Sequence, residues 1–235
     1  MSYYPVIVVL LLAILDWIAA DKKIKSLEYF AKPATMLALL WWVWQSVGWG
    51  GPMLWFTIGI IFCLAGDVFL MLPFDMFIFG LLAFLVGHIS YIIGLNNAPP
   101  FINLMGMIMI LLLRNPLAII TVVILIIYLV WLYPKLAGGL KARGKAGLRI
   151  PVLVYSLVIS LMVYSAMLTW HRPAWPSSAA LSASIGAVLF FASDSMLAWD
   201  RFLKPLSHAR LRVMTTYHLG QIGIILGAML SISGK

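Results

Sequence analysis

Two acidic side chains, Asp67 and Asp194, stand inside segments that are otherwise apolar enough to cross a lipid bilayer. Asp67 lies in the run from 62 to 73, and Asp194 in the run from 190 to 197. An ionised Asp at such a position costs several kcal/mol unless it is paired, hydrated or protonated. Two carboxylates that are not accompanied by a catalytic nucleophile are typical of a general acid and a general base. We therefore predict that they share one polar pocket and catalyse acid/base chemistry on a lipid-like substrate.

The sequence offers little support for other catalytic chemistries. Ser193 and Ser195 flank Asp194, but the chain contains no GxSxG motif of a serine hydrolase. It also lacks HExxH, and His88 with two carboxylates would be a sparse set of zinc ligands. Cys63 is the single cysteine, which excludes an internal disulfide and a cysteine-built metal site. We expect neither a metal ion nor another cofactor.

The composition identifies the elements that must position these residues. Hydrophobic residues make up 64% of the chain and charged residues only 10%, which excludes a soluble domain. The apolar runs lack the alternation of barrel strands, so helices must cross the bilayer. We predict one all-α domain over 1–235, a polytopic membrane bundle of eight transmembrane helices. The predicted spans are about 3–20, 33–49, 53–72, 76–96, 115–133, 150–170, 178–199 and 213–232.

A further apolar segment, 101–113, follows Pro99 and Pro100. It is shorter than the roughly 17 to 25 residues that a transmembrane helix needs. We predict that it is interfacial or re-entrant. A ninth span would also move most of the later cations to the wrong side of the membrane.

The net charge of +9 would suggest nucleic-acid binding in a soluble protein, but here the cations lie mainly in short loops beside apolar runs. With eight spans, the loops after the first, third, fifth and seventh span share one side. Such a bias predicts cytoplasmic basic loops and both termini outside. Thirteen of the sixteen Lys and Arg lie on this side, namely Lys22, Lys23, Lys25, Lys32, Lys135, Lys141, Arg143, Lys145, Arg149, Arg201, Lys204, Arg210 and Arg212, against Arg114, Arg172 and Lys235.

The positive-inside rule accounts for this distribution of cations, so no nucleic-acid partner is required to explain it. We expect membrane lipids to be the partners. The Trp-rich, strongly basic chain looks bacterial, so we expect it in the inner (cytoplasmic) membrane of a bacterium. The oligomeric state stays open.

Helix geometry places further polar residues near the two acids. At 1.5 Å per residue, Asp67 and Asp194 lie about 8 and 9 Å inside the same end of their helices. The neighbouring polar residues form i,i+3 or i,i+4 pairs on single helix faces, or lie at a comparable depth. We therefore predict substrate contacts for Lys32, Thr35, His88, Tyr91, Tyr217 and Gln221.

Each of these residues also has a structural interpretation, because polar side chains commonly bridge helices in bundles. Asp16 ends the first span so close to the interface that we expect it to be hydrated or paired with Lys22. His218 points about 100° away from Tyr217 around the helix and is a weaker candidate.

Six short motifs carry these residues. In chain order they are Lys32-Pro33-x-Thr35, Gly66-Asp67-x-x-Leu70-Met71, Gly80-x-x-x-Phe84-x-x-Gly87-His88-x-x-Tyr91, Val154-Tyr155 with Ala166, Phe190-x-x-Ser193-Asp194 and Thr216-Tyr217-x-x-Gly220-Gln221. In combination they resemble the YhhN-like membrane family, which contains the animal lysoplasmalogenases. The resemblance covers about residues 30 to 230 and implies an eight-helix protein. It also implies hydrolysis of the vinyl-ether bond of a lysoplasmalogen to a fatty aldehyde and a glycerophospho-base, with the family's two intramembrane aspartates carried onto Asp67 and Asp194.

The implied reaction suits a pair of carboxylates. Vinyl-ether hydrolysis requires protonation of the β-carbon, followed by attack of water on the carbon that bears oxygen. One acid must be protonated and the other ionised, as in glycosidases, whose transition state is also cation-like. We expect Lys32 or nearby cations to meet the phosphate, while His88, Tyr91, Tyr217 and Gln221 orient substrate or water.

Two other function classes compete with this hydrolase. A proton-coupled transporter or lipid carrier could use the same aspartates as a titrating relay, although the chain shows neither paired Gly/Pro-broken helices nor a repeated half. A structural membrane protein is disfavoured by two acids at one depth. An enzyme should have a pocket open at one end, whereas a transporter needs a route to both faces.

Overall fold

Long helices account for nearly all of the chain that the computed structural model describes, residues 4–96 and 116–233; the predicted segment 101–113 lies outside these ranges. The α-helices within them are α1 (Tyr4–Lys22), α2 (Lys25–Val47), α3 (Leu54–Met71), α4 (Phe77–Asn96), α6 (Pro116–Ala142), α7 (Arg149–Met167), α8 (Ser177–Phe202) and α9 (Ala209–Ser233). Short 3-10 turns precede α3 (Gly51–Met53) and α7 (Ala146–Leu148), and another follows α7 (Leu168–His171).

The predicted all-α membrane bundle is confirmed. Seven of the described helices are long and apolar enough to cross a membrane. The remaining helix, α2, is less apolar because Lys25, Glu28 and Lys32 occupy its first turns and Trp and Gln residues occupy its second half. It nevertheless packs against α1, α3 and α9 within the bundle.

The start of α2 differs from the sequence-based expectation. The predicted span begins at about residue 33, but α2 begins at Lys25, so Pro33 lies inside it. The preceding Lys, Leu, Glu and Ala residues favour helix and extend it by about two turns before Pro33. Proline removes one backbone donor, which membrane helices tolerate where neighbouring groups or water satisfy the freed carbonyl. The extra turns place Glu28 on the same helix face as Lys32.

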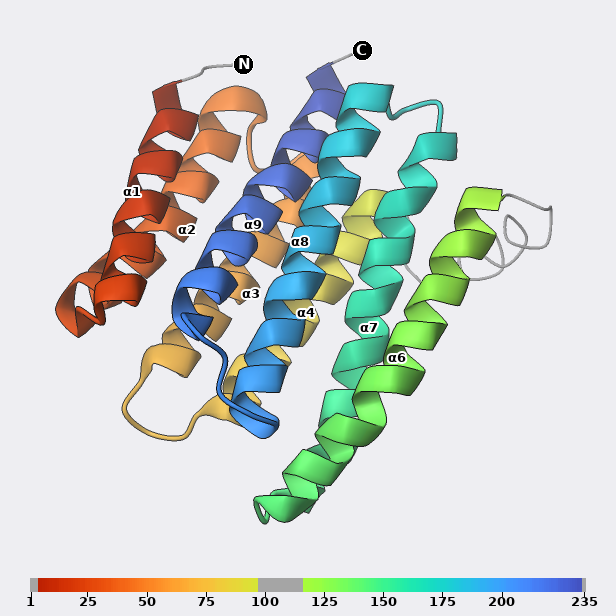
Figure 1. The fold of residues 1–235 in the computed structure, drawn as a ribbon. Coiled ribbons are helices and arrows are strands. Elements are labelled where there is room, and N and C mark those ends of the chain that lie inside the picture. The colour runs from red at the N-terminus through yellow and green to blue at the C-terminus, as the bar shows by residue number, and fades with distance from the viewer. Residues whose placement is uncertain (1–3, 97–115, 234–235) are drawn as a thin grey trace.

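Helices that follow one another in the chain pair closely, as the short loops predict. The most extensive packing joins α8 with α9, α3 with α4, and α1 with α2, while α7 lies between α4 and α8 (Figure 1). In contrast, α6 packs mainly on α7 and α8 and leaves most of its surface exposed. Both ends of the chain lie at one end of the bundle (Figure 1).

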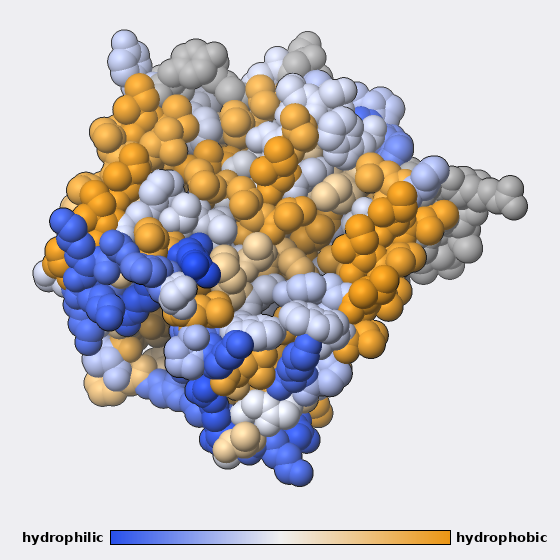
Figure 2. All heavy atoms as spheres, in the orientation of Figure 1, coloured by the Kyte–Doolittle hydropathy of each residue, from blue (hydrophilic) through white to orange (hydrophobic). Residues whose placement is uncertain are grey.

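The opposite end of the bundle carries the loops between α1 and α2, α3 and α4, α6 and α7, and α8 and α9, and we call it the basic end. Hydrophilic residues gather there, whereas apolar residues cover the helix bodies (Figure 2). Asp75 ties the loop between α3 and α4 to the loop between α6 and α7 and to the last turn of α8, accepting from Lys145 Nζ at 2.7 Å and from Arg201 Nη2 at 2.8 Å. The hydrogen bond from Lys145 and the charge of Arg201 lower the pKa of Asp75.

Glycines allow α8 and α9 to approach until their backbones touch. A Cβ atom added to Gly186 would lie 2.4 Å from the backbone nitrogen of Ile224 and 2.7 Å from the carbonyl oxygen of Gly220. Backbone atoms cannot move aside as a flexible side chain can, so only glycine fits this crossing. Small residues at such seams are the usual way in which membrane helices pack closely.

We predict that Gly186→Ala destabilises the protein, because overpacking typically costs about 1–3 kcal/mol. Gly138→Ala is the matched control, since a Cβ at this exposed position in α6 meets nothing within 4 Å. In detergent, the midpoint temperature of thermal unfolding should fall clearly for Gly186→Ala and stay unchanged or rise slightly for Gly138→Ala. Equal midpoints for the two variants would contradict the described seam.

Candidate functional site

A polar cavity of about 430 Å³ enters the bundle from the basic end. Its wall begins at Lys25 and Arg210, near the starts of α2 and α9, and reaches Asp67 on α3 and Asp194 on α8. The structure thus brings the two predicted acids into one cavity. Helices that are distant in sequence supply the wall, because α9 packs against α1, α2 and α8 at once.

Asp67 is almost completely buried, and both of its carboxylate oxygens have partners. Lys32 Nζ lies 3.1 Å from Oδ1, and the Tyr217 hydroxyl donates to Oδ2 at 2.7 Å. Lys32 itself is only 4% exposed, so this ion pair is shielded from solvent. An ammonium group and a hydroxyl donor together satisfy an ionised carboxylate at this depth.

Behind Asp67, a chain of hydrogen bonds holds Tyr217 in place. Gln221 Nε2 donates to the Tyr217 hydroxyl at 3.4 Å, and Gln221 Oε1 accepts from the Tyr91 hydroxyl at 2.5 Å. The Tyr91 ring packs directly over Gly59, where an added Cβ would lie 2.2 Å from a ring carbon. This series of hydrogen bonds therefore links α4 and α9 to the carboxylate on α3.

Asp194 has a different environment. The Tyr155 hydroxyl donates to its Oδ2 atom, and His88 Nε2 lies 3.3 Å from the same oxygen and 2.9 Å from the Tyr155 hydroxyl. On the other side of its ring, His88 Nδ1 lies 3.3 Å from the sulfur of Met162. The Asp194 side chain remains 13% exposed. One carboxylate oxygen is thus held by the protein while the group still faces the cavity.

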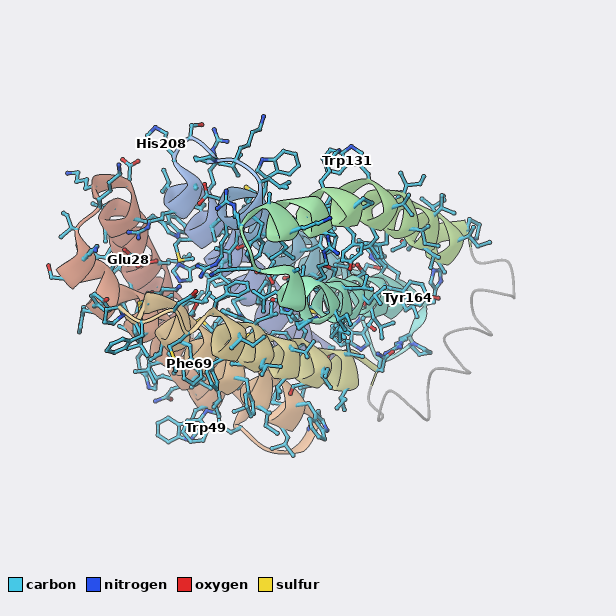
Figure 3. All side chains as sticks on the ribbon, turned by 90° about the horizontal axis from the view of Figure 1, so that it is seen from below. Glu28, Trp49, Phe69, Trp131, Tyr164 and His208 are labelled. Atoms are coloured by element: carbon cyan, nitrogen blue, oxygen red, sulfur yellow. The ribbon has the colours of Figure 1, made fainter. Side chains whose placement is uncertain are left out.

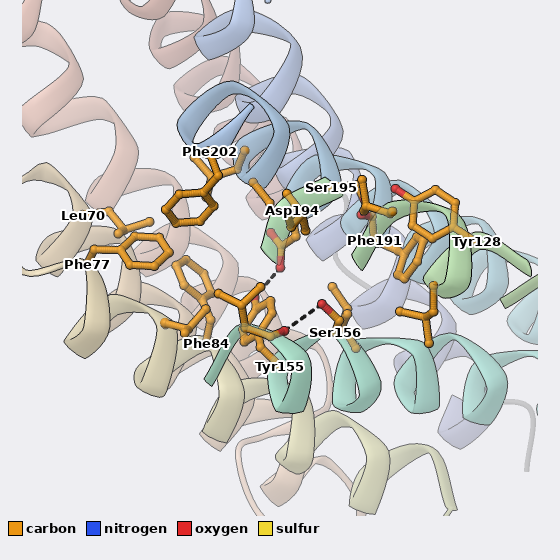
Figure 4. A pocket seen from close by; sticks show the side chains of 18 residues that line it. Leu70, Phe77, Phe84, Tyr128, Tyr155, Ser156, Phe191, Asp194, Ser195 and Phe202 are labelled. Carbon is orange, nitrogen blue, oxygen red and sulfur yellow. Dashed lines mark hydrogen bonds between the residues drawn. The ribbon is translucent and has the colours of Figure 1, made fainter. Parts of the chain in front are cut away.

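An apolar slot continues from Asp194 between α4, α6, α7 and α8 (Figure 4). Aromatic and aliphatic side chains line it, including Phe84, Tyr128 and Phe191. The slot shares five wall residues with the polar cavity, namely Leu70, Phe77, Phe84, Asp194 and Leu197. Asp194 therefore lies where a polar space meets an apolar one.

The other predicted site residues divide into two groups. Lys32 and Tyr217 line the cavity beside Asp67. In the described structure His88, Tyr91 and Gln221 lie behind the wall. His88 contacts Asp194 and Gln221 donates to Tyr217, both of which line the cavity, while Tyr91 donates to Gln221.

Thr35 is buried and donates its hydroxyl to the carbonyl of Ala31 in the same helix at 2.8 Å. A substrate contact for Thr35 stays a prediction.

Tyr155 is the site residue that the analysis by depth and spacing missed. It contacts both His88 and Asp194, yet the positions three and four residues away on its own helix are apolar and give it no polar partner on the same face. The available signal was the Val154-Tyr155 pair among the family motifs.

The expectation for Asp16 was wrong. Asp16 is completely buried, and neither carboxylate oxygen has a hydrogen-bond partner among the described residues. Its nearest ionisable neighbour is His218, whose Nε2 lies 4.0 Å from Oδ2, and His218 Nδ1 accepts from the Trp17 indole at 3.2 Å. The cause is the packing of α1 against α2 and α9, which turns Asp16 inward rather than toward water or Lys22.

No group of three or more His, Cys, Asp or Glu side chains within 4–96 and 116–233 is placed to hold a metal ion.

Comparison with known proteins gives one family and several named relatives. The family model described as "YhhN family" matches residues 27–228. Lysoplasmalogenase TMEM86B of Mus musculus is 31% identical over 226 residues, covering 96% of this chain and 85% of the relative. The lysoplasmalogenase of Mycobacterium tuberculosis is 29% identical over 181 residues, covering 74% of this chain and 59% of the relative. No solved structure matches the chain.

We predict that Lys32→Met destabilises the protein strongly, because removal of one partner from a buried ion pair costs about 3–5 kcal/mol. Lys25→Met, on the exposed first turn of the same helix, should change stability little. Thermal unfolding in detergent measures both.

The double variant Lys32→Met with Asp67→Asn tests the pairing itself. It should recover part of the lost stability, because no charge is then left without its partner. Strictly additive losses would contradict the coupling between Lys32 and Asp67.

Proposed function

This chain belongs to the YhhN family, and from that premise we propose that it hydrolyses the vinyl-ether bond of lysoplasmalogen-like lysophospholipids. The products would be a fatty aldehyde and a glycerophospho-base. Relatives named lysoplasmalogenase, about 30% identical, support a membrane hydrolase of this class. The two-aspartate mechanism is our inference from the site.

The observation that carries the proposal is the position of Asp194 between the polar cavity and the apolar slot. A lysoplasmalogen has a charged head group at one end and a long alkenyl chain at the other, and its vinyl-ether bond joins the two parts. With the head group in the cavity and the chain in the slot, this bond lies beside Asp194. The same placement keeps Asp67 within the polar part of the site.

We assign the general acid to Asp194 and the general base to Asp67. The proton must reach the β-carbon, which belongs to the alkenyl chain, and Asp194 is the acid that also lines the apolar slot. Asp67 is paired with Lys32 and Tyr217, which suits an ionised carboxylate that can accept a proton from water. Two carboxyl groups in unlike environments commonly divide acid and base roles in this way.

The reaction then proceeds in three balanced steps. Asp194 transfers its proton to the β-carbon, which leaves an oxocarbenium ion and the Asp194 carboxylate. Water adds to the carbon that bears oxygen while Asp67 takes the released proton, giving a hemiacetal. Asp67 then protonates the departing glycerol oxygen and Asp194 takes the hemiacetal hydroxyl proton, so that the aldehyde forms and both acids return to their starting states.

The remaining side chains hold these groups in position. Tyr155 and His88 orient Asp194, while Gln221 and Tyr91 act on Asp67 through Tyr217. We propose that the Lys32 ammonium also faces the phosphate side of the substrate, since Lys32 lines the cavity.

The cavity opens at the basic end, which the positive-inside rule assigns to the cytoplasm. Substrate would then enter from the cytoplasmic leaflet of the membrane, with both termini on the opposite side.

Asp67→Asn and Asp194→Asn should each lower aldehyde release from a lysoplasmalogen by about 10²–10⁴-fold, the usual contribution of a general acid or base. Asp21→Asn is the matched control, because Asp21 is an exposed carboxylate bonded to His208 at the protein surface. Thermal unfolding of each purified variant separates lost catalysis from lost folding. Full turnover by either folded site variant would overturn the assigned roles, and no turnover by folded wild-type protein would remove this substrate.

A further inference from the structure

The mouth of the polar cavity holds an ion pair that the proposed chemistry does not use. Arg210 Nη1 lies 3.2 Å from Glu28 Oε2, and both residues line the cavity. Glu28 belongs to α2, which approaches α9 here, and it is labelled in the view from the basic end (Figure 3). We propose that Glu28 and Arg210 form a head-group subsite that selects zwitterionic lysophospholipids over anionic ones, a specificity that rests on the proposed function.

Helix register relates this pair at the cavity mouth to Lys32 and Tyr217, which lie beside Asp67. Glu28 precedes Lys32 by four residues on α2, so the two lie on one helix face about 6 Å apart along the axis. Arg210 precedes Tyr217 by seven residues on α9, which is about 10 Å, or nearly two turns. Lys32 and Tyr217 both contact Asp67, so both faces lead from the ion pair to the reacting groups. A three-carbon glycerol unit separates the vinyl-ether oxygen from the phosphate. A substrate whose vinyl ether lies beside Asp194 can therefore extend its head group along the same cavity toward the pair.

The charges of the pair complement those of a zwitterionic head group. A phosphate can accept from the Arg210 guanidinium in a bidentate manner, while a head-group ammonium can donate to Glu28. The ion pair opens easily, because the Arg210 side chain is 54% exposed and exposed pairs contribute only about 0–1 kcal/mol. Exchanging partners leaves every charge neutralised, so binding of the zwitterion creates no unpaired group.

An anionic head group cannot complete this exchange. Its phosphate can still engage Arg210, but Glu28 then loses its partner and faces a second negative charge. The Glu28 side chain is only 16% exposed, so water compensates this repulsion incompletely. A subsite that rejects a competitor through an unpaired charge is a common source of specificity. Glu28 is therefore the discriminating residue, and Arg210 binds both kinds of head group.

Binding of saturated ether lysophospholipids tests the subsite without requiring turnover. The probes are 1-O-alkyl-glycerophosphoethanolamine and the corresponding 1-O-alkyl-glycerol phosphate, whose alkyl chains lack the reactive double bond. Affinity is measured from intrinsic tryptophan fluorescence of the full-length protein in detergent. Wild-type protein should prefer the phosphoethanolamine probe by about tenfold, the worth of one charge-assisted hydrogen bond. Wild-type protein that shows no preference would overturn the proposal.

Three variants separate recognition from a purely structural ion pair. Glu28→Gln should remove the preference by strengthening binding of the anionic probe, and Arg210→Gln should weaken both probes. The exchange variant Glu28→Arg with Arg210→Glu keeps an ion pair but reverses its direction, so the preference should stay lost. Recovery of the wild-type ratio in the exchange variant, or its retention in Glu28→Gln, would refute the subsite. Asp21→Asn serves again as the control carboxylate.

This binding assay also distinguishes the two proposals. A protein that shows the predicted head-group ratio but releases no aldehyde contradicts the hydrolase assignment and keeps the subsite. A protein that releases aldehyde from both kinds of head group at equal rates, with equal affinities for the probes, contradicts the subsite and keeps the hydrolase.

Discussion

The buried ion pair between Lys32 and Asp67 is the interaction on which the site depends. It joins α2 to α3, and Tyr217 extends it to α9, so three helices of the bundle meet at one carboxylate. A carboxylate at this depth would be too costly without such partners. The same partners leave Asp67 in the wall of the cavity. Asp67 therefore both joins helices of the bundle and serves as the general base of the proposed mechanism.

The arrangement of the remaining helices gives the site its two compartments. The glycine seam between α8 and α9 brings Asp194 and Tyr217 into the wall of one cavity. The outer helix α6 packs less tightly on α7 and α8, and the apolar slot lies along this contact. An amphipathic substrate needs both compartments, and a membrane enzyme can take its apolar chain directly from the bilayer. The ion pair of Glu28 and Arg210 adds a charged entrance to the polar compartment.

The fold was largely predictable because a bilayer imposes simple rules. Long apolar runs must be helices, and short loops make sequential neighbours, as for α3 and α4. The common depth of Asp67 and Asp194 followed from helical rise alone. The two acids do line one cavity, whereas their catalytic roles remain a proposal. Depth says nothing about direction around a helix, however. For this reason the burial of Asp16, the position of Tyr155 and the pairing of Lys32 with Asp67 required the packing of helices that are distant in sequence.

The central claim is that the Asp194 carboxyl group, held inside the bundle, transfers a proton to carbon. Hydrolysis of a lysoplasmalogen by the purified protein in D₂O tests this most directly, with immediate reduction of the aldehyde and determination of the deuterium content and configuration at the labelled carbon of the alcohol. The account predicts slower turnover in D₂O and one deuterium delivered to a single face of the carbon next to the former aldehyde carbon, so that one enantiomer forms. A racemic label would show that a free enol is released and then protonated in solution, and the paired-acid account would fail.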